Sequence, residues 1–167
     1  MVLIVIGNII SFAAAVFLLA GCWTRDRDRT FLYQIFEAAL LCLANVFFNS
    51  WSGITTLLLS AIRNWIILKN RFNERWMVFF GVAVTVLGLL MNNRGWVGLL
   101  PILATDQLII CNQYAKRMIP IKLSLLVNTM IWLVYSVMIW DISSTVAQAV
   151  TCVACVGAIA RLKQEGN

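Results

Sequence analysis

Seven stretches of apolar residues follow one another along the chain, separated by short polar connections. A helix needs about 20 predominantly apolar residues to cross the hydrocarbon core of a bilayer, and these stretches approach that length. The pattern therefore predicts an all-α polytopic membrane protein with seven transmembrane helices. The stretches cover residues 2–23, 31–49, 53–69, 76–92, 96–113, 119–139 and 143–161.

The composition supports the membrane assignment. Hydrophobic residues make up 62% of the 167 residues and charged residues only 12%, and the mean hydropathy is +0.88. A soluble domain of this size would need more polar surface, so membrane lipid is the expected partner. The net charge of +6 comes from basic residues in short loops, which argues against nucleic-acid binding. The oligomeric state stays open, a homo-oligomer included.

The positively charged residues lie almost entirely in alternate connections. Ten loop or tail Lys and Arg residues fall on one side of the predicted membrane, and Arg94 alone falls on the other. Because cytoplasmic loops are enriched in Lys and Arg, we predict that the N-terminus lies outside and the C-terminus in the cytoplasm. Seven spans satisfy this orientation. The ten residues are Arg25, Arg27, Arg29, Lys69, Arg71, Arg75, Lys116, Arg117, Arg161 and Lys163.

Side chains suited to catalysis or metal binding are scarce. The chain has no histidine, and of its five cysteines the closely spaced Cys152 and Cys155 lie in an apolar stretch without a second pair of ligands. We therefore expect small buried side chains there, with no metal site and no cofactor. Without a histidine base or a Ser–Lys pair, we predict that the chain is not an enzyme.

The chain also contains an internal repeat. A shift of 89 residues places Trp51 on Trp140 and Cys22 on Cys111, with the same order of stretch, basic loop, stretch, tryptophan turn and stretch in both halves. The fourth stretch has no counterpart and would act as a linker, so both halves enter the membrane in the same direction. The predicted domains are residues 1–72, a linker at 73–93, and residues 94–167.

Three segments carry a resemblance to a known family: residues 59–64 (Leu-Ser-Ala-Ile-Arg-Asn), residues 95–102 (Gly-Trp-Val-Gly-Leu-Leu-Pro-Ile) and residues 132–135 (Trp-Leu-Val-Tyr). With them the chain resembles the bacterial inner-membrane YgjV family, and its plan is similar to that of the SWEET and PQ-loop transporters and of the PnuC-type carriers. The resemblance implies a bacterial inner-membrane location and a three-plus-one-plus-three arrangement of helices. It also implies a solute near an asparagine on the third helix, a role that Asn64 would fill.

Polar residues recur at helical spacing within the apolar stretches, and three of them are charged: Glu37, Arg63 and Asp106. Glu37 and Arg63 flank one turn at similar depth, so an ion pair between them is the favoured interpretation for these two alone. The whole set favours a polar cavity at the middle of the membrane, in which the three charges form one layer. The other candidates for contact with a solute are Asn45, Ser60, Asn64, Asn128, Trp132 and Gln148.

Two functions remain open from these residues. The first is a facilitative or proton-coupled carrier of a small polar metabolite such as a sugar, nucleoside or vitamin, because an indole beside amides offers stacking and directional hydrogen bonds. Glu37 or Asp106 would then carry the coupled proton, since burial favours a protonated carboxyl group. The alternative is a structural or partner-binding membrane protein whose polar residues form an internal ion-pair network.

Overall fold

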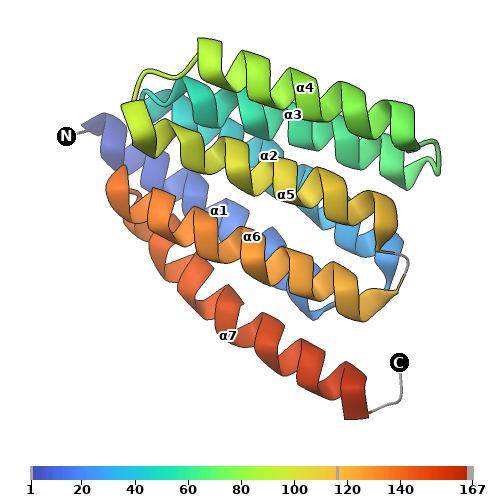
Figure 1. The fold of residues 1–167 in the computed structure, drawn as a ribbon. Coiled ribbons are helices and arrows are strands. Elements are labelled where there is room, and N and C mark those ends of the chain that lie inside the picture. Colours follow the sequence, from blue (N-terminus) through green and yellow to red (C-terminus); the bar gives the residue numbers. More distant parts are fainter. Residues whose placement is uncertain (1, 116, 165–167) are drawn as a thin grey trace.

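The computed structural model describes residues 2–115 and 117–164, which fold into seven α-helices and one short 3-10 helix without a strand (Figure 1). Lys116, one of the ten predicted cytoplasmic basic residues, lies outside the described residues. The helices match the seven predicted stretches to within a few residues. They are α1 (Val2–Trp23), α2 (Arg27–Phe47), α3 (Trp51–Leu68), α4 (Glu74–Leu90), η1 (Gly95–Gly98), α5 (Leu99–Tyr114), α6 (Met118–Met138) and α7 (Ile142–Gln164).

Six helical segments of the described chain are long and apolar enough to cross a membrane: α1, α2, α3, α6, α7, and η1 together with α5 (Gly95–Tyr114, 20 residues). The α4 helix has 17 residues, which rise about 25 Å at 1.5 Å per residue. This length is at the lower limit for a transmembrane helix. The structure thus confirms seven helices and six candidate spans, and the transmembrane position of α4 stays a prediction.

The six helices other than α4 pack as a closed ring. The α2 helix packs between α1 and α3, α6 packs between α5 and α7, and contacts of α1 with α7 and of α3 with α5 close the ring. The α4 helix packs outside against α3 and α5. Successive helices alternate in direction, so the N-terminus and the C-terminus lie at opposite ends of the bundle (Figure 1). We call these ends the N-end, with the turns at 48–50 and 139–141, and the C-end, with the loops at 24–26 and 69–73.

The two groups of three helices correspond by a shift of 91 residues. The α2 helix covers Arg27–Phe47 and α6 covers Met118–Met138, so both boundaries move by 91. The ends of α1 and α5 and the starts of α3 and α7 move by the same number. Buried residues correspond by the same shift of 91: Leu41 corresponds to Trp132, and Phe48 corresponds to Ile139.

The shift of 89 residues predicted from the sequence is therefore wrong by two. Trp51 is the first residue of α3, whereas Trp140 lies in the turn before α7. The backbone hydrogen bonds of the two turns correspond at 91: Ser50 N donates to Asn45 O, and Asp141 N donates to Ser136 O, both over 3.0 Å. The residue preceding each donor has a positive φ, 52° at Asn49 and 63° at Trp140, as a helix end of this kind requires.

Two cations from the second half of the chain cap the end of α1. Lys122 Nζ donates to Gly21 O over 2.7 Å, and Arg161 Nη2 donates to Trp23 O over 3.1 Å. The last carbonyl groups of a helix have no partner within the helix and carry partial negative charge, so both contacts are favourable. They account for the burial of Lys122 within the bundle, where its side chain is 1% exposed.

A disulfide also joins α1 to α7. It links Cys22 with Cys155, whose Cα atoms are 5.7 Å apart. The sequence predicts only a small buried side chain at Cys155, so this link is an addition to that expectation. Cys152, its neighbour in the sequence pattern, remains a free thiol.

The predicted orientation can be tested at two exposed positions, one at each end of the bundle. Trp96, which is 63% exposed, lies at the N-end, and Arg71 lies in a C-end loop. With the unaltered chain as the control for native cysteines, a membrane-impermeant maleimide should label Trp96→Cys in intact cells and Arg71→Cys only after permeabilisation. Labelling of Arg71→Cys in intact cells would contradict the orientation.

Candidate functional site

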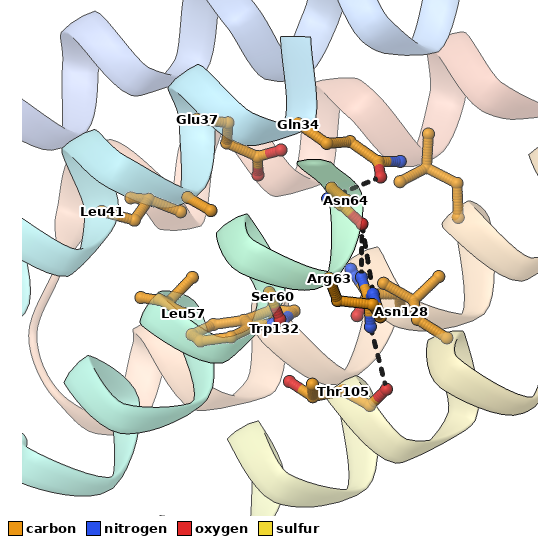
Figure 2. A pocket seen from close by; sticks show the side chains of 13 residues that line it. Gln34, Glu37, Leu41, Leu57, Ser60, Arg63, Asn64, Thr105, Asn128 and Trp132 are labelled. Atoms are coloured by element: carbon orange, nitrogen blue, oxygen red, sulfur yellow. Dashed lines mark hydrogen bonds between the residues drawn. The ribbon is translucent and has the colours of Figure 1, made fainter. Parts of the chain in front are cut away.

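A cavity of about 40 Å³ lies among α2, α3, α5 and α6 (Figure 2). One water needs about 10–15 Å³ measured in this way, so the cavity has room for about three. Polar and apolar side chains both contribute to the walls. The lining residues are Gln34, Glu37, Ala38, Leu41, Leu57, Ser60, Arg63, Asn64, Thr105, Leu108, Leu125, Asn128 and Trp132.

The structure brings most of the predicted site residues together. Six of the nine line this central cavity, namely Glu37, Ser60, Arg63, Asn64, Asn128 and Trp132. Asn45 and Gln148 line a second cavity of about 10 Å³, which also has Leu41, Trp132 and Asp141 in its wall. Asp106 lines neither cavity.

Hydrogen bonds to neutral oxygens hold Arg63 in place. Its Nε and Nη2 donate to Asn64 Oδ1 over 3.1 and 2.9 Å, and its Nη1 donates to Thr105 O over 3.4 Å (Figure 2). Asn64 Nδ2 in turn donates to Gln34 Oε1 over 3.2 Å. This chain of contacts connects α2, α3 and α5 around a guanidinium group that is 1% exposed. Asn64 thus positions Arg63 as well as lining the cavity, and its contact with a solute stays a prediction.

Glu37 does not form the predicted ion pair with Arg63. Figure 2 shows its carboxylate at the cavity, well apart from the guanidinium group. Within residues 2–115 and 117–164, no hydrogen bond or ion pair engages the Glu37 carboxylate. The central cavity therefore contains an acid and a base that do not neutralise each other by contact.

Asp106 faces α4 rather than the central cavity. Thr85 Oγ1 of α4 donates to Asp106 Oδ2 over 2.8 Å, and Asp106 Oδ1 is buried without a partner in the described part of the chain. Its charge still acts on Arg63 through space. Of the three charges predicted to form one layer in the cavity, Glu37 and Arg63 line it and Asp106 does not.

Leu41 and Trp132 lie between the central cavity and the second one. Both side chains line both cavities, and they occupy corresponding positions on α2 and α6. Asn128 Oδ1 on the central side and Gln148 Oε1 on the other are buried without a hydrogen-bond partner among the described residues. Burying a polar atom without a hydrogen-bond partner costs free energy. These two oxygens therefore mark positions where a water or a polar solute would bind favourably.

A group of hydrogen-bonded side chains closes the N-end beyond the second cavity. Tyr135 OH donates to Asn45 Oδ1 over 3.2 Å and accepts from the Ser50 hydroxyl. Ser11 Oγ donates to Asp141 Oδ2 over 2.7 Å. We call these five residues the N-end cluster, and its contacts connect α1, α2 and the turn before α3 with α6 and with the turn before α7.

Asp141 has two roles in the N-end cluster. Besides binding Ser11, its Oδ1 accepts from Ser144 N over 2.9 Å and so caps the first turn of α7. Burial raises the pKa of this carboxyl group from its ordinary value, and the hydrogen bonds from Ser144 and Ser11 oppose that rise. The sequence analysis does not single out Asp141 as a site residue, although an aspartate directly before an apolar helical stretch is a recognisable capping signal.

Comparison with known proteins identifies the family. Residues 5–166 match the Imp-YgjV family, described as a bacterial inner membrane protein. Because the match covers nearly the whole chain, the chain belongs to this family. The family description and the apolar helices confirm the predicted location in a bacterial inner membrane. Searches of curated proteins and of solved structures found no match.

The N-end cluster predicts an unusual response to a glycine substitution. A Cβ atom at Gly53 would lie 2.5 Å from Asn45 Oδ1 and 2.8 Å from Tyr135 OH. Gly53→Ala should therefore lower stability by about 1–3 kcal/mol, as overpacking does, although alanine favours helix by about 1 kcal/mol. The control is Gly81→Ala, where nothing lies within 4 Å of the new Cβ, and it should stabilise. Thermal unfolding in detergent would compare them, and equal melting temperatures would contradict this close packing.

The contacts of Arg63 predict the outcome of a double-mutant cycle. Arg63→Met should cost about 2–3 kcal/mol, because it leaves Asn64 Oδ1 and Thr105 O without their charged donor. Glu37→Gln should change stability little, and the double variant should be additive within about 0.5 kcal/mol because the two side chains are not in contact. Recovery of stability in the double variant would show that the two residues do form an ion pair.

Proposed function

We propose that this member of the Imp-YgjV family carries a small polar metabolite across the bacterial inner membrane through the central cavity. The observation that supports this function best is the pair of polar cavities within the ring, divided by Leu41 and Trp132. Glu37, Asn128 and Gln148 present acceptors there that the described chain does not satisfy. A packed structural core would be expected to pair such groups or replace them with apolar side chains.

The proposed arrangement is two parallel three-helix repeats, α1–α3 and α5–α7, with α4 as the linker, as in SWEET-type carriers. The common shift of 91 residues in helix boundaries and buried positions supports it. The proposed orientation places the N-end outside, since among the described loop and tail residues the basic side chains other than Arg94 lie toward the C-end.

In this proposal the structure represents a state closed at both ends. At the N-end, the bonds of Ser11 with Asp141 and of Ser50 with Tyr135 connect the two repeats. At the C-end, Lys122 and Arg161 connect them through the carbonyl groups of α1. Transport would break one set of contacts at a time, so that the central cavity opens to one side of the membrane and then to the other.

If a proton accompanies the solute, Glu37 is the group to carry it, because it lines the central cavity and Asp106 does not. The alternative function, a structural membrane protein without transport, is favoured by one observation. The chain of contacts from Gln34 through Asn64 to Arg63 and Thr105 satisfies the buried guanidinium group internally.

The two functions differ in their response to small solutes. A carrier should melt at a higher temperature in detergent with at least one member of a panel of sugars, nucleosides, vitamins and amino acids, since ligand at 100 times its dissociation constant stabilises by about 2.7 kcal/mol. The same solute should exchange across proteoliposomes. Leu41→Ala should change the exchange rate, whereas Leu43→Ala, a matched change at a 50% exposed position of the same helix, should not.

The structural function predicts a different set of results. If no solute shifts melting or exchanges, and Asn128→Leu stabilises the protein, the structural function is correct. Stabilisation is expected in that case because the leucine removes an unpaired buried acceptor.

A further inference from the structure

The central cavity contains two opposite charges whose contacts leave each of them available. Glu37 and Arg63 both line it, yet no ion pair joins them in the described structure. We infer that the solute of this cavity is a small zwitterion, with its ammonium group at Glu37 and its carboxylate at Arg63. This inference rests on the proposed carrier function and specifies the chemical class of its substrate.

Arg63 provides the anion-binding side. Its guanidinium group stays charged at every physiological pH and has five N–H donors. Three hydrogen bonds go to the uncharged oxygens of Asn64 and Thr105, which leaves two N–H groups without a contact among the described residues. A carboxylate at this side would add charge-assisted hydrogen bonds and neutralise the cation, which neutral oxygens cannot do.

Glu37 provides the cation-binding side. The Glu37 carboxylate and the unpaired Asn128 Oδ1 both line the cavity, and the two residues occupy corresponding positions on α2 and α6. Neither acceptor receives a hydrogen bond within the described chain. An ammonium group has three donors and no acceptor, so it can satisfy the Glu37 carboxylate with charge-assisted hydrogen bonds.

The contacts of Asn64 explain why the acid and the base remain separate. Its Oδ1 binds two nitrogen atoms of Arg63, and its Nδ2 is held by Gln34 of α2. The guanidinium group is therefore fixed from α3 and α5 and is not free to turn toward Glu37. Two opposite charges held apart in a small cavity match a solute that carries both opposite charges.

Charge balance distinguishes a zwitterion from the other small solutes. Asp106 acts on Arg63 only through space, so a neutral solute would leave Glu37 and Arg63 without a contacting counter-charge in the cavity, and a simple ion would provide one to only one of them. A zwitterion neutralises both and crosses without moving net charge. The central cavity has a volume of about 40 Å³, which is room for about three waters. In this closed state, its size favours the smallest amino acids as solutes.

Four matched probes test this inference on the full-length protein in detergent and in proteoliposomes. Glycine carries both charges, glycinamide only the ammonium group, N-acetylglycine only the carboxylate, and N-acetylglycinamide neither. At neutral pH glycine should raise the melting temperature most, and labelled glycine should exchange across the liposomes. Glu37→Gln should raise the glycine concentration for half-maximal stabilisation about tenfold or more, whereas Glu74→Gln, a matched change of an exposed acid, should leave it unchanged.

The failures of the two proposals are distinguishable. Stronger stabilisation and exchange by a neutral or singly charged probe, or by a solute of the wider panel, would overturn the zwitterion while leaving the carrier function intact. An unchanged glycine response in Glu37→Gln would also overturn the zwitterion. No response to any probe or panel solute, in melting or in exchange, would overturn both proposals.

Discussion

The buried guanidinium group of Arg63 is the constraint on which the centre of this bundle depends. The lipid around the bundle offers no hydrogen-bond acceptors to a buried cation, so the protein provides them itself. It does so with Asn64 and the backbone of Thr105, and Asn64 is held by Gln34. Three helices are thereby fixed around one cation, and the cavity beside them keeps its polar wall.

The helices were predictable from the sequence because length and hydrophobicity alone determine them in a membrane. Their exact ends were less so, since these depend on individual capping contacts. The α2 helix begins at Arg27, four residues before the apolar stretch, because the Asp26 side chain accepts hydrogen bonds from Asp28 N and Arg29 N. The sequence alignment of the two halves uses a shift of 89 residues, whereas the helix boundaries correspond at 91, because a tryptophan near the membrane surface need not occupy the same position in both turns.

The residues of the candidate site were largely predictable, whereas their partners were not. Counting residues along a stretch gives the depth of a side chain in the membrane but not the direction in which it points. Each residue turns an α-helix by about 100°, so Thr105 contributes to the central cavity while its neighbour Asp106 faces α4. For the same reason, equal depth did not bring Glu37 to Arg63. Such angular relations depend on how whole helices pack, which the periodicity of one helix does not determine.

The two ends of the bundle are closed by different chemistry. The C-end contacts of Lys122 and Arg161 set cations against the backbone carbonyl groups of α1. The N-end cluster includes the carboxyl group of Asp141, whose pKa is raised by burial and lowered by the hydrogen bonds from Ser144 and Ser11. Protonation there would weaken the bond from Ser11 and leave the C-end contacts as they are. The two ends can therefore open under different conditions, and a change that loosens the contacts at one end leaves the other end closed.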